Sequence, residues 1–247
     1  GLSKDCSRQL LGSACLAGCA LVRLNLSANA VSSTALGAWL AQNGGSLKEL
    51  HAAMCGGLQT AKVVDAILGN GSLLADATEI SGGGIESLSL SGNDIGAGAG
   101  AGAGSAKAVR GASAALAQLC ARSAALRWLQ LAGMELRNKS LVALLEGMEQ
   151  NEPAGSDEAH SAQTLLLHDN DFSSPSGASE KAVMRRPWRL LPGCGQMISV
   201  LDVSDCRIGV DGMADLAAAA AQCPALTRLR ASRNIGAGAC GGSSGNA

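Results

Sequence analysis

Aromatic residues are scarce in this chain of 247 residues, which has one phenylalanine, no tyrosine and three tryptophans. Because 47% of the residues are nevertheless apolar, the core volume must come from leucine, valine, isoleucine and alanine. Small aliphatic side chains suit thin, closely packed layers better than the thick core of a large globular domain. The scarcity of aromatics therefore favours an elongated architecture with a narrow core.

A charge excess of one sign is also missing, because 19 basic and 20 acidic residues give a formal net charge of −1. We therefore expect no whole-chain attraction to nucleic acid or to an anionic membrane. We see no apolar run of bilayer-spanning length and no secretory signal, so we expect no membrane insertion. The chain starts at Gly1 in the middle of a pattern, and we expect a processed form or part of a longer protein.

Cysteines with paired spacing are lacking as well. Nine cysteines is an odd number, which argues against a disulfide framework and favours a reducing, cytoplasmic setting. Four of them fall just before predicted strands, where we expect small buried thiols: Cys19, Cys120, Cys194 and Cys223.

Motifs of enzymes and cofactor sites are not found. The chain has no Gly-x-x-x-x-Gly-Lys-Ser/Thr loop and no Gly-x-Ser-x-Gly elbow. Its three histidines lack the spacing of a zinc site, and we interpret His168 as a surface residue whose neighbour Asp169 points elsewhere or round the turn. We interpret Asp202 and Asp205 as structural or partner-facing polar residues. The sequence therefore predicts no enzymatic activity, no cofactor, no metal and no small-molecule substrate.

One apolar phrase recurs along the chain, with apolar residues at its first, fourth and sixth positions and asparagine or cysteine at its ninth. It reads cleanly over residues 21–31, 85–95 and 198–208. Seven copies align by their first position: Leu21, Leu47, Ile85, Leu126, Ala162, Ile198 and Leu226. A repeat that cannot bury its own apolar face has to stack on its neighbours, so we predict a solenoid of about seven repeats forming a single domain over 1–247.

Each copy begins with about six residues of alternating apolar and polar character, which predicts a strand. A helical pattern follows in several copies, and Asp211 is a candidate N-cap of the last helix. The predicted helices cover 3–18, 34–42, 59–68, 106–121, 139–149 and the residues after Ile208.

Low-complexity inserts lengthen the third to fifth copies. Residues 96–105 alternate glycine and alanine, 151–160 are polar and acidic, and 173–187 combine serine, proline and a basic cluster. Such segments have little side chain to bury, so we predict three flexible loops.

The ninth position of the phrase calls for a side chain that can satisfy backbone groups of a neighbouring turn. An asparagine amide both donates and accepts hydrogen bonds, so a column of asparagines is expected to form a ladder along the solenoid. The position holds, in order, Asn29, Cys55, Asn93, Met134, Asn170, Cys206 and Asn234.

This phrase resembles that of the leucine-rich repeat superfamily. The segments 93–96, 208–213 and 234–239 also resemble the turn into the helix of its ribonuclease-inhibitor-like subclass. The resemblance covers nearly the whole chain. It implies an α/β fold, a horseshoe-shaped solenoid with a parallel β-sheet on the concave face and helices on the convex face.

The strand positions between the leucines point to the concave face, so equivalent positions of neighbouring copies form columns. One column is Arg23, Glu49, Ser87, Trp128, Thr164, Val200 and Arg228; the next is Asn25, His51, Ser89, Gln130, Leu166, Asp202 and Arg230. An outward tryptophan is a typical anchor for a partner, although the insert 151–160 is an alternative cover for it. The candidate partner-binding residues are Trp128, Arg127, Gln130, Leu166, Val200, Asp202, Arg228 and Arg230.

The resemblance is specific for the fold and much less so for the function. We interpret the chain as a non-catalytic protein–protein interaction scaffold and a subunit of a larger intracellular assembly, with cytoskeletal and ciliary complexes as settings. Two alternatives stay open. One is a regulator of an enzyme, either a GTPase activator of the Ran type or an inhibitor of the ribonuclease-inhibitor kind. The other is a ubiquitin-ligase substrate adaptor, which would need a further domain.

Overall fold

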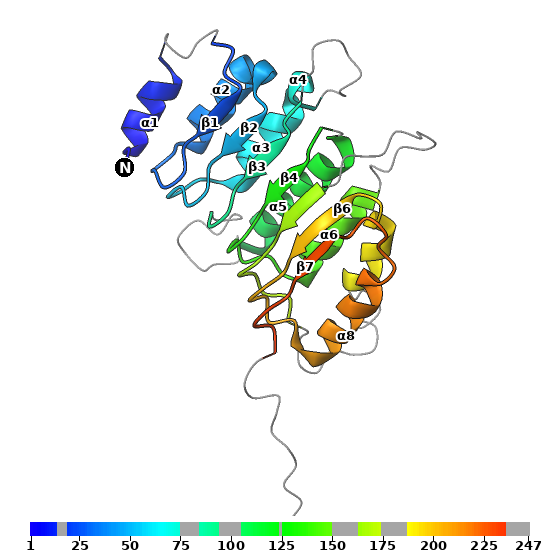
Figure 1. The fold of residues 1–247 in the computed structure, drawn as a ribbon. Coiled ribbons are helices and arrows are strands. Elements are labelled where there is room, and N and C mark those ends of the chain that lie inside the picture. Colours follow the sequence, from blue (N-terminus) through cyan, green and yellow to red (C-terminus); the bar gives the residue numbers. More distant parts are fainter. Residues whose placement is uncertain are drawn as a thin grey trace, which may run out of the picture.

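The computed structural model describes residues 1–13, 19–74, 84–93, 105–123, 125–149, 163–173 and 187–235. These residues form seven short strands in one parallel sheet, whose order across the sheet is the order along the chain (Figure 1). The strands are β1 (Arg23–Asn25), β2 (Glu49–His51), β3 (Ser87–Ser89), β4 (Trp128–Gln130), β5 (Gln163–Leu166), β6 (Ile198–Asp202) and β7 (Arg228–Arg230).

Each strand contains a leucine that points inward, and the seven leucines are paired in register across the sheet. In order they are Leu24, Leu50, Leu88, Leu129, Leu165, Leu201 and Leu229. The first six are at most 9% exposed, whereas Leu229 at the end of the row is 38% exposed. The repeats therefore share one continuous interior, and the register confirms the two outward columns predicted from the sequence.

Helices cover one face of the sheet and leave the other face open (Figure 1). The helix of each repeat packs on the helix of the next repeat, just as the strands pair in order. Each repeat therefore contributes to both the sheet and the helix layer. The helical elements are α1 (Lys4–Leu11), α2 (Ser33–Asn43), η1 (Gly44–Ser46), α3 (Thr60–Gly69), α4 (Gly71–Leu74), α5 (Ser105–Arg122), α6 (Asn138–Glu149), η2 (Pro187–Cys194) and α8 (Gly209–Ala220).

The predicted helices of the interior repeats are confirmed to within one or two residues, and local chemistry explains where some begin. The hydroxyl of Ser32 accepts the N–H of Ala35 and so caps α2. The first helix is shorter than predicted, because α1 ends at Leu11 and Gly12 follows as its C-cap. Residues 14–18 of that prediction lie outside the described residues.

One prediction about helices is wrong. Asp211 is not the N-cap of α8, because the helix already starts at Gly209 and Asp211 lies within its first turn. A helical element that the sequence did not predict, η2, begins at Pro187, the last residue of the insert 173–187. The ring of Trp188 in η2 packs edge-on against Phe172, with 6.0 Å between centroids, and both residues are 2% exposed. This buried aromatic pair gives the fifth repeat a helical layer that its low-complexity sequence did not indicate.

The three predicted inserts fall almost entirely outside the described residues, as 96–104, 151–160 and 174–186 do. Their flexibility therefore stays a prediction. So does the alternative that 151–160 covers Trp128.

The asparagine ladder is confirmed at the ninth position of the phrase. Asn170 donates to the backbone oxygens of Leu131 at 2.9 Å and Leu167 at 2.7 Å, and it accepts from the N–H groups of Met134 and Leu136. Asn93 and Asn234 make equivalent bonds to the turn of the preceding copy. The cysteines of this column also bond backward, because the thiols of Cys55 and Cys206 lie 3.2 and 3.1 Å from backbone oxygens of the preceding copy.

The residue just before the ninth position of the phrase has a left-handed backbone in every copy. Position eight of the phrase has φ between 51° and 65° in all seven copies. Two copies place glycine there, where this φ carries little strain, and two place aspartate, which tolerates it better than most residues. The residues are Ala28, Met54, Gly92, Gly133, Asp169, Asp205 and Arg233.

The two ends of the sheet differ. At the first end α1 packs on α2, and the hydroxyl of Ser7 accepts the N–H of Ser32 at 3.3 Å. The N–H of Leu2 also donates to the Asn29 side chain at 2.6 Å. At the other end, β7 carries three exposed side chains. The described residues thus cover the β1 end of the interior better than the β7 end.

Candidate functional site

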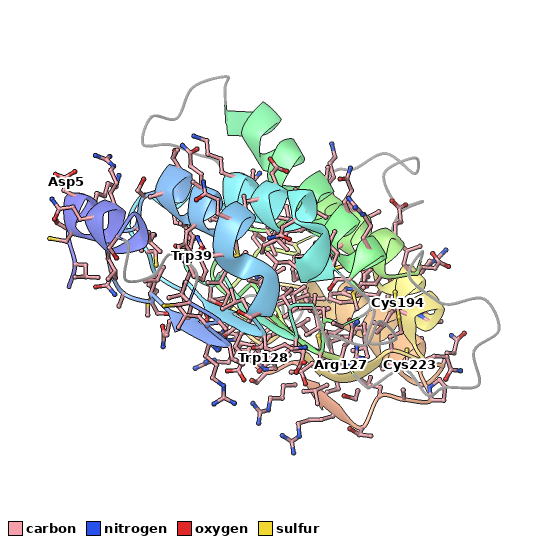
Figure 2. All side chains as sticks on the ribbon, turned by 90° about the horizontal axis from the view of Figure 1, so that it is seen from above. Asp5, Trp39, Arg127, Trp128, Cys194 and Cys223 are labelled. Atoms are coloured by element: carbon pink, nitrogen blue, oxygen red, sulfur yellow. The ribbon has the colours of Figure 1, made fainter. Side chains whose placement is uncertain are left out.

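The candidate site is the open face of the sheet, where the outward side chains of seven strands lie side by side. Neighbouring parallel strands are about 4.8 Å apart, so register partners can touch across the sheet. Figure 2 shows Trp128 and Arg127 on the strand side of the molecule, and Trp39 under the helices. Trp39 is 2% exposed, whereas Trp128 is partly exposed.

Trp128 lies near the middle of this face and packs against a histidine two strands away. The rings of Trp128 and His51 are 5.7 Å apart between centroids and are tilted by 52°. They meet because β3, which separates their strands, carries only serines on this face, Ser87 and Ser89. Ser89 is 3% exposed and its hydroxyl contacts the Gln130 side-chain oxygen at 3.1 Å. This packing holds a large amphipathic side chain in a defined position, as a binding anchor requires.

Aliphatic side chains continue the surface from Trp128 toward β7. Thr164 is the register partner of Trp128 in β5, and Val200 is the register partner of Thr164 in β6. Leu166 lies in the adjacent column, and all three are partly exposed. We call Trp128, Leu166 and Val200 the apolar patch. It brings together three residues that the sequence predicted for partner binding.

Charged residues flank the apolar patch on both sides. On the β1 side, Arg23 forms an ion pair with its register partner Glu49 at 2.9 Å. On the β7 side, Arg230 lies 3.8 Å from its register partner Asp202, which is 8% exposed. Arg228 is exposed and makes no ion pair among the described residues. The predicted set thus has an apolar centre and a charged rim, the usual arrangement of a protein-binding surface.

Two of the predicted site residues, Arg127 and Gln130, lie beside the apolar patch and outside its charged rim. Arg127 precedes β4, is partly buried, and its guanidinium approaches the Leu126 backbone oxygen at 3.4 Å. It therefore borders the apolar patch and does not belong to an outward column. Gln130 does lie in an outward column, where its contact with Ser89 leaves it beside the Trp128 and His51 pair.

His51 is a site residue that sequence reasoning missed. The spacing of the histidines indicates only that a zinc-site pattern is lacking, whereas the column alignment already places His51 two strands from Trp128. The signal is the pair of small serines between them, which leaves room for two rings to meet over β3.

The described cysteines are free thiols, and burial makes most of them poor nucleophiles. Burial raises the pKa of Cys206 to about 12 and that of Cys120 to about 12. Cys194 and Cys223 are buried as predicted, whereas Cys19 is exposed, so that prediction is wrong. The residue precedes β1, the first strand of the sheet, where no earlier strand packs against the chain.

No reaction centre emerges from the described residues. His168 and Asp169 are in contact, with 2.7 Å from Nδ1 to Oδ2, so of the two arrangements left open by the sequence the structure has the one round the turn, where the left-handed backbone of Asp169 turns its carboxylate back. The hydroxyl of Ser173 lowers the pKa of Asp171, whose carboxylate braces its own turn and lies 4.0 Å from the guanidinium of Arg207. Within the described ranges, no three His, Cys, Asp or Glu side chains form a group that could hold a metal ion.

Membrane insertion is a separate question, which concerns helix length and apolarity. Among the residues that the structure describes, no helix has both the length and the apolar content that crossing a bilayer requires.

Comparison with known proteins gives one match. Residues 196–217 match the sequence profile of a family described as Leucine Rich repeat, and they span β6 and most of α8. No curated protein matches the chain. Leucine-rich repeats are in general non-catalytic interaction modules, and a seven-stranded parallel sheet with helices on one face fits a solenoid of this kind. The chain is thus similar to leucine-rich repeat proteins in one matched unit and in the architecture that the units build.

Proposed function

We propose that this protein is a non-catalytic scaffold that binds a protein partner on the open face of its sheet. The observation that carries the proposal is the apolar patch, in which a partly exposed tryptophan is held by ring packing and flanked by a charged rim. Aromatic anchors in defined positions contribute most to the binding energy of typical interfaces.

The proposal includes the shape of the molecule. Packed helices lie about 8–10 Å apart, whereas parallel strands lie about 4.8 Å apart. Because each unit contributes to both layers, the helix layer is wider than the sheet and bends the solenoid around the strands. We therefore propose a horseshoe with the open face on its concave side. The segments 93–96, 208–213 and 234–239, which resemble the turn into the helix of the ribonuclease-inhibitor-like subclass, support that subclass.

We place the protein inside the cell as a structural subunit of a larger assembly. The support is chemical: the described cysteines are free thiols, and five of them are buried where a reducing setting keeps them intact. A cytoskeletal or ciliary complex is the setting that the family resemblance implies, and a ubiquitin-ligase adaptor remains an alternative.

An enzyme regulator of the GTPase-activator type receives less support from the arginines. Such a regulator that acts through an arginine needs a side chain free to reach a partner's nucleotide. Arg23, Arg230 and Arg233 are each engaged with a carboxylate on the same face or at its edge, which leaves Arg228 as the outward-column arginine without an ion pair among the described residues. Stimulated hydrolysis in a GTPase assay with small GTPases would restore this alternative.

Site-specific photocrosslinking in cells tests the proposed function. A photoreactive amino acid in place of Leu166 samples the apolar patch, and one in place of Gln42, exposed on α2, samples the helix layer as a control. We expect a discrete crosslinked species from position 166 that Trp128→Ala reduces at least about tenfold, as loss of a central aromatic anchor does. Equal crosslinking from both positions, or no effect of Trp128→Ala on a variant with unchanged circular dichroism, would contradict the proposal.

A further inference from the structure

Among the residues that the structure describes, β7 is the last strand of the sheet, and no strand lies along its outer edge. Leu229 is 38% exposed, and two further large aliphatic residues of the last repeats, Val210 on α8 and Ile235, are 55% and 51% exposed. In the preceding copy the N–H of Val203 donates to the Arg230 oxygen at 2.8 Å. The equivalent N–H of Ala231 has no backbone partner among the described residues.

From this edge we propose a second interaction surface, which adjoins the charged rim of the open face. The β7 edge binds a β-strand of a different protein chain, in which an aliphatic residue pairs with Leu229 and an adjacent acidic residue lies opposite Arg228. The bound strand continues the sheet by backbone hydrogen bonds and covers the aliphatic end of the core.

Self-pairing of β7 is disfavoured by its own arginines. The N–H and C=O groups of Leu229 and Ala231 point outward, so they would form the ladder with a second copy. Antiparallel pairing of Leu229 with Leu229 puts Arg228 opposite Arg230, and pairing of Leu229 with Ala231 puts Arg230 opposite Arg230. Like charges directly opposite one another destabilise a strand pair, and edge strands commonly use charge in this way to prevent self-association.

Head-to-tail stacking of two copies meets the same obstacle. If β1 of a second copy continued the sheet beyond β7, the register would pair Leu24 with Leu229 and Arg23 with Arg228. The arginine pair is again repulsive. In addition, α1 packs on α2 at the β1 end of the sheet.

An acidic partner strand reverses this repulsion at Arg228 in particular. Asp202 already offsets part of the charge on Arg230 at 3.8 Å, whereas the register partner of Arg228 is the uncharged Val200. At the other end of the same outward column an arginine already has an acidic residue opposite it, because Arg23 is paired with Glu49 on the neighbouring strand at 2.9 Å. Residues 236–247 contain no leucine, isoleucine, valine or aromatic residue that could pair with Leu229.

Charge reversal at Arg228 tests the inference without a known partner. In the Arg228→Glu variant, antiparallel pairing about Leu229 would place the introduced carboxylate opposite Arg230 twice. We expect its dimer dissociation constant, measured by sedimentation equilibrium, to be at least about tenfold lower than that of the wild type. Arg189→Glu changes the charge equally on an exposed residue of η2 and should behave as the wild type. Equal self-association of wild type and Arg228→Glu would overturn the inference.

A peptide titration tests the partner chemistry directly. Three peptides, identical except for a central Glu–Leu–Glu, Lys–Leu–Lys or Glu–Ala–Glu, are added to isotopically labelled protein while amide chemical shifts are followed. We expect the first peptide to shift the amides of residues 228–233 and to bind at least about tenfold more tightly than the other two. No shift with Glu–Leu–Glu, or equal binding of the lysine peptide, would count against the proposed strand.

Discussion

At the scale of single residues, the buried asparagines of the ladder stabilise this fold by forming hydrogen bonds with backbone groups of the turns. Asn170 is 4% exposed, and its amide satisfies two backbone oxygens and two backbone N–H groups of adjoining turns. A buried backbone group that loses its partner keeps the full cost of its lost hydration. The column therefore fixes both the turn geometry and the spacing of copies.

Asn170→Ala should lower the free energy of unfolding by about 2–4 kcal/mol, because several buried backbone groups would lose their partner at once. Asn25→Ala is a matched control, since that exposed side chain accepts a single bond, from the N–H of Ser27. The control should change stability by no more than about 0.5 kcal/mol. Urea denaturation of both variants measures the difference, and similar losses would argue against the ladder.

Thiol reactivity should divide the cysteines by burial. With iodoacetamide at about pH 8, the native protein should be alkylated at the exposed Cys6 and Cys19 and spared at Cys120 and Cys206, whose pKa values are about 12. Peptide mass spectrometry after timed quenching reads the pattern. Rapid labelling of Cys206 in folded protein would show that the β6 turn is open.

The raised pKa of Cys206 also makes the free energy of unfolding depend on pH. The folded-state pKa of Cys206 lies above the ordinary value of 9.0, so deprotonation favours the unfolded chain. Its contribution to stability should be present below pH 9 and should be lost as the pH rises toward about 12. Urea midpoints measured across that window for wild type and Cys206→Ala should converge as the pH rises.

At the scale of elements, close approach of helices sets how tightly the repeats stack. Gly147 in α6 faces α5 so closely that an added Cβ would lie 2.2 Å from the Ala117 backbone oxygen. Backbone atoms cannot move aside as a flexible side chain can, so the two helices would have to separate. Gly147 is therefore a contact point between the fourth repeat and its neighbour.

Gly147→Ala should destabilise the protein by about 1–3 kcal/mol despite the better helix propensity of alanine. Gly69 in α3 is the matched helical control, because an added Cβ there meets no atom within 4 Å. Gly69→Ala should be neutral or slightly stabilising. Thermal unfolding of both variants separates the two effects, and a neutral Gly147→Ala would mean that α5 and α6 pack less closely.

Sequence reasoning succeeded where one element repeats the same chemistry. The leucine phrase predicted the strand register, the interior helices and both outward columns, because each copy supplies the same buried side chain at the same position. It failed where a contact depends on residues far apart in the chain. The ring contact of His51 with Trp128 depends on the serines of an intervening strand, and η2 depends on Trp188 meeting Phe172 across an insert.

At the scale of the whole molecule, the same backbone hydrogen bond joins each repeat to the next. In each of the first six copies the N–H at the sixth position of the phrase donates to a backbone oxygen of the next strand. These groups belong to Leu26, Ala52, Leu90, Leu131, Leu167 and Val203, with distances of 2.7 to 3.0 Å. The seventh equivalent, Ala231, has no such partner among the described residues, in which β7 is the last strand of a continuous sheet.

Amide hydrogen exchange followed residue by residue by nuclear magnetic resonance tests this most directly. The account predicts slow exchange at the six bonded N–H groups and fast exchange at Ala231 in the protein alone. Fast exchange at Leu90, Leu131 or Leu167, or protection of Ala231 equal to theirs, would contradict a single sheet that runs from β1 and ends at β7.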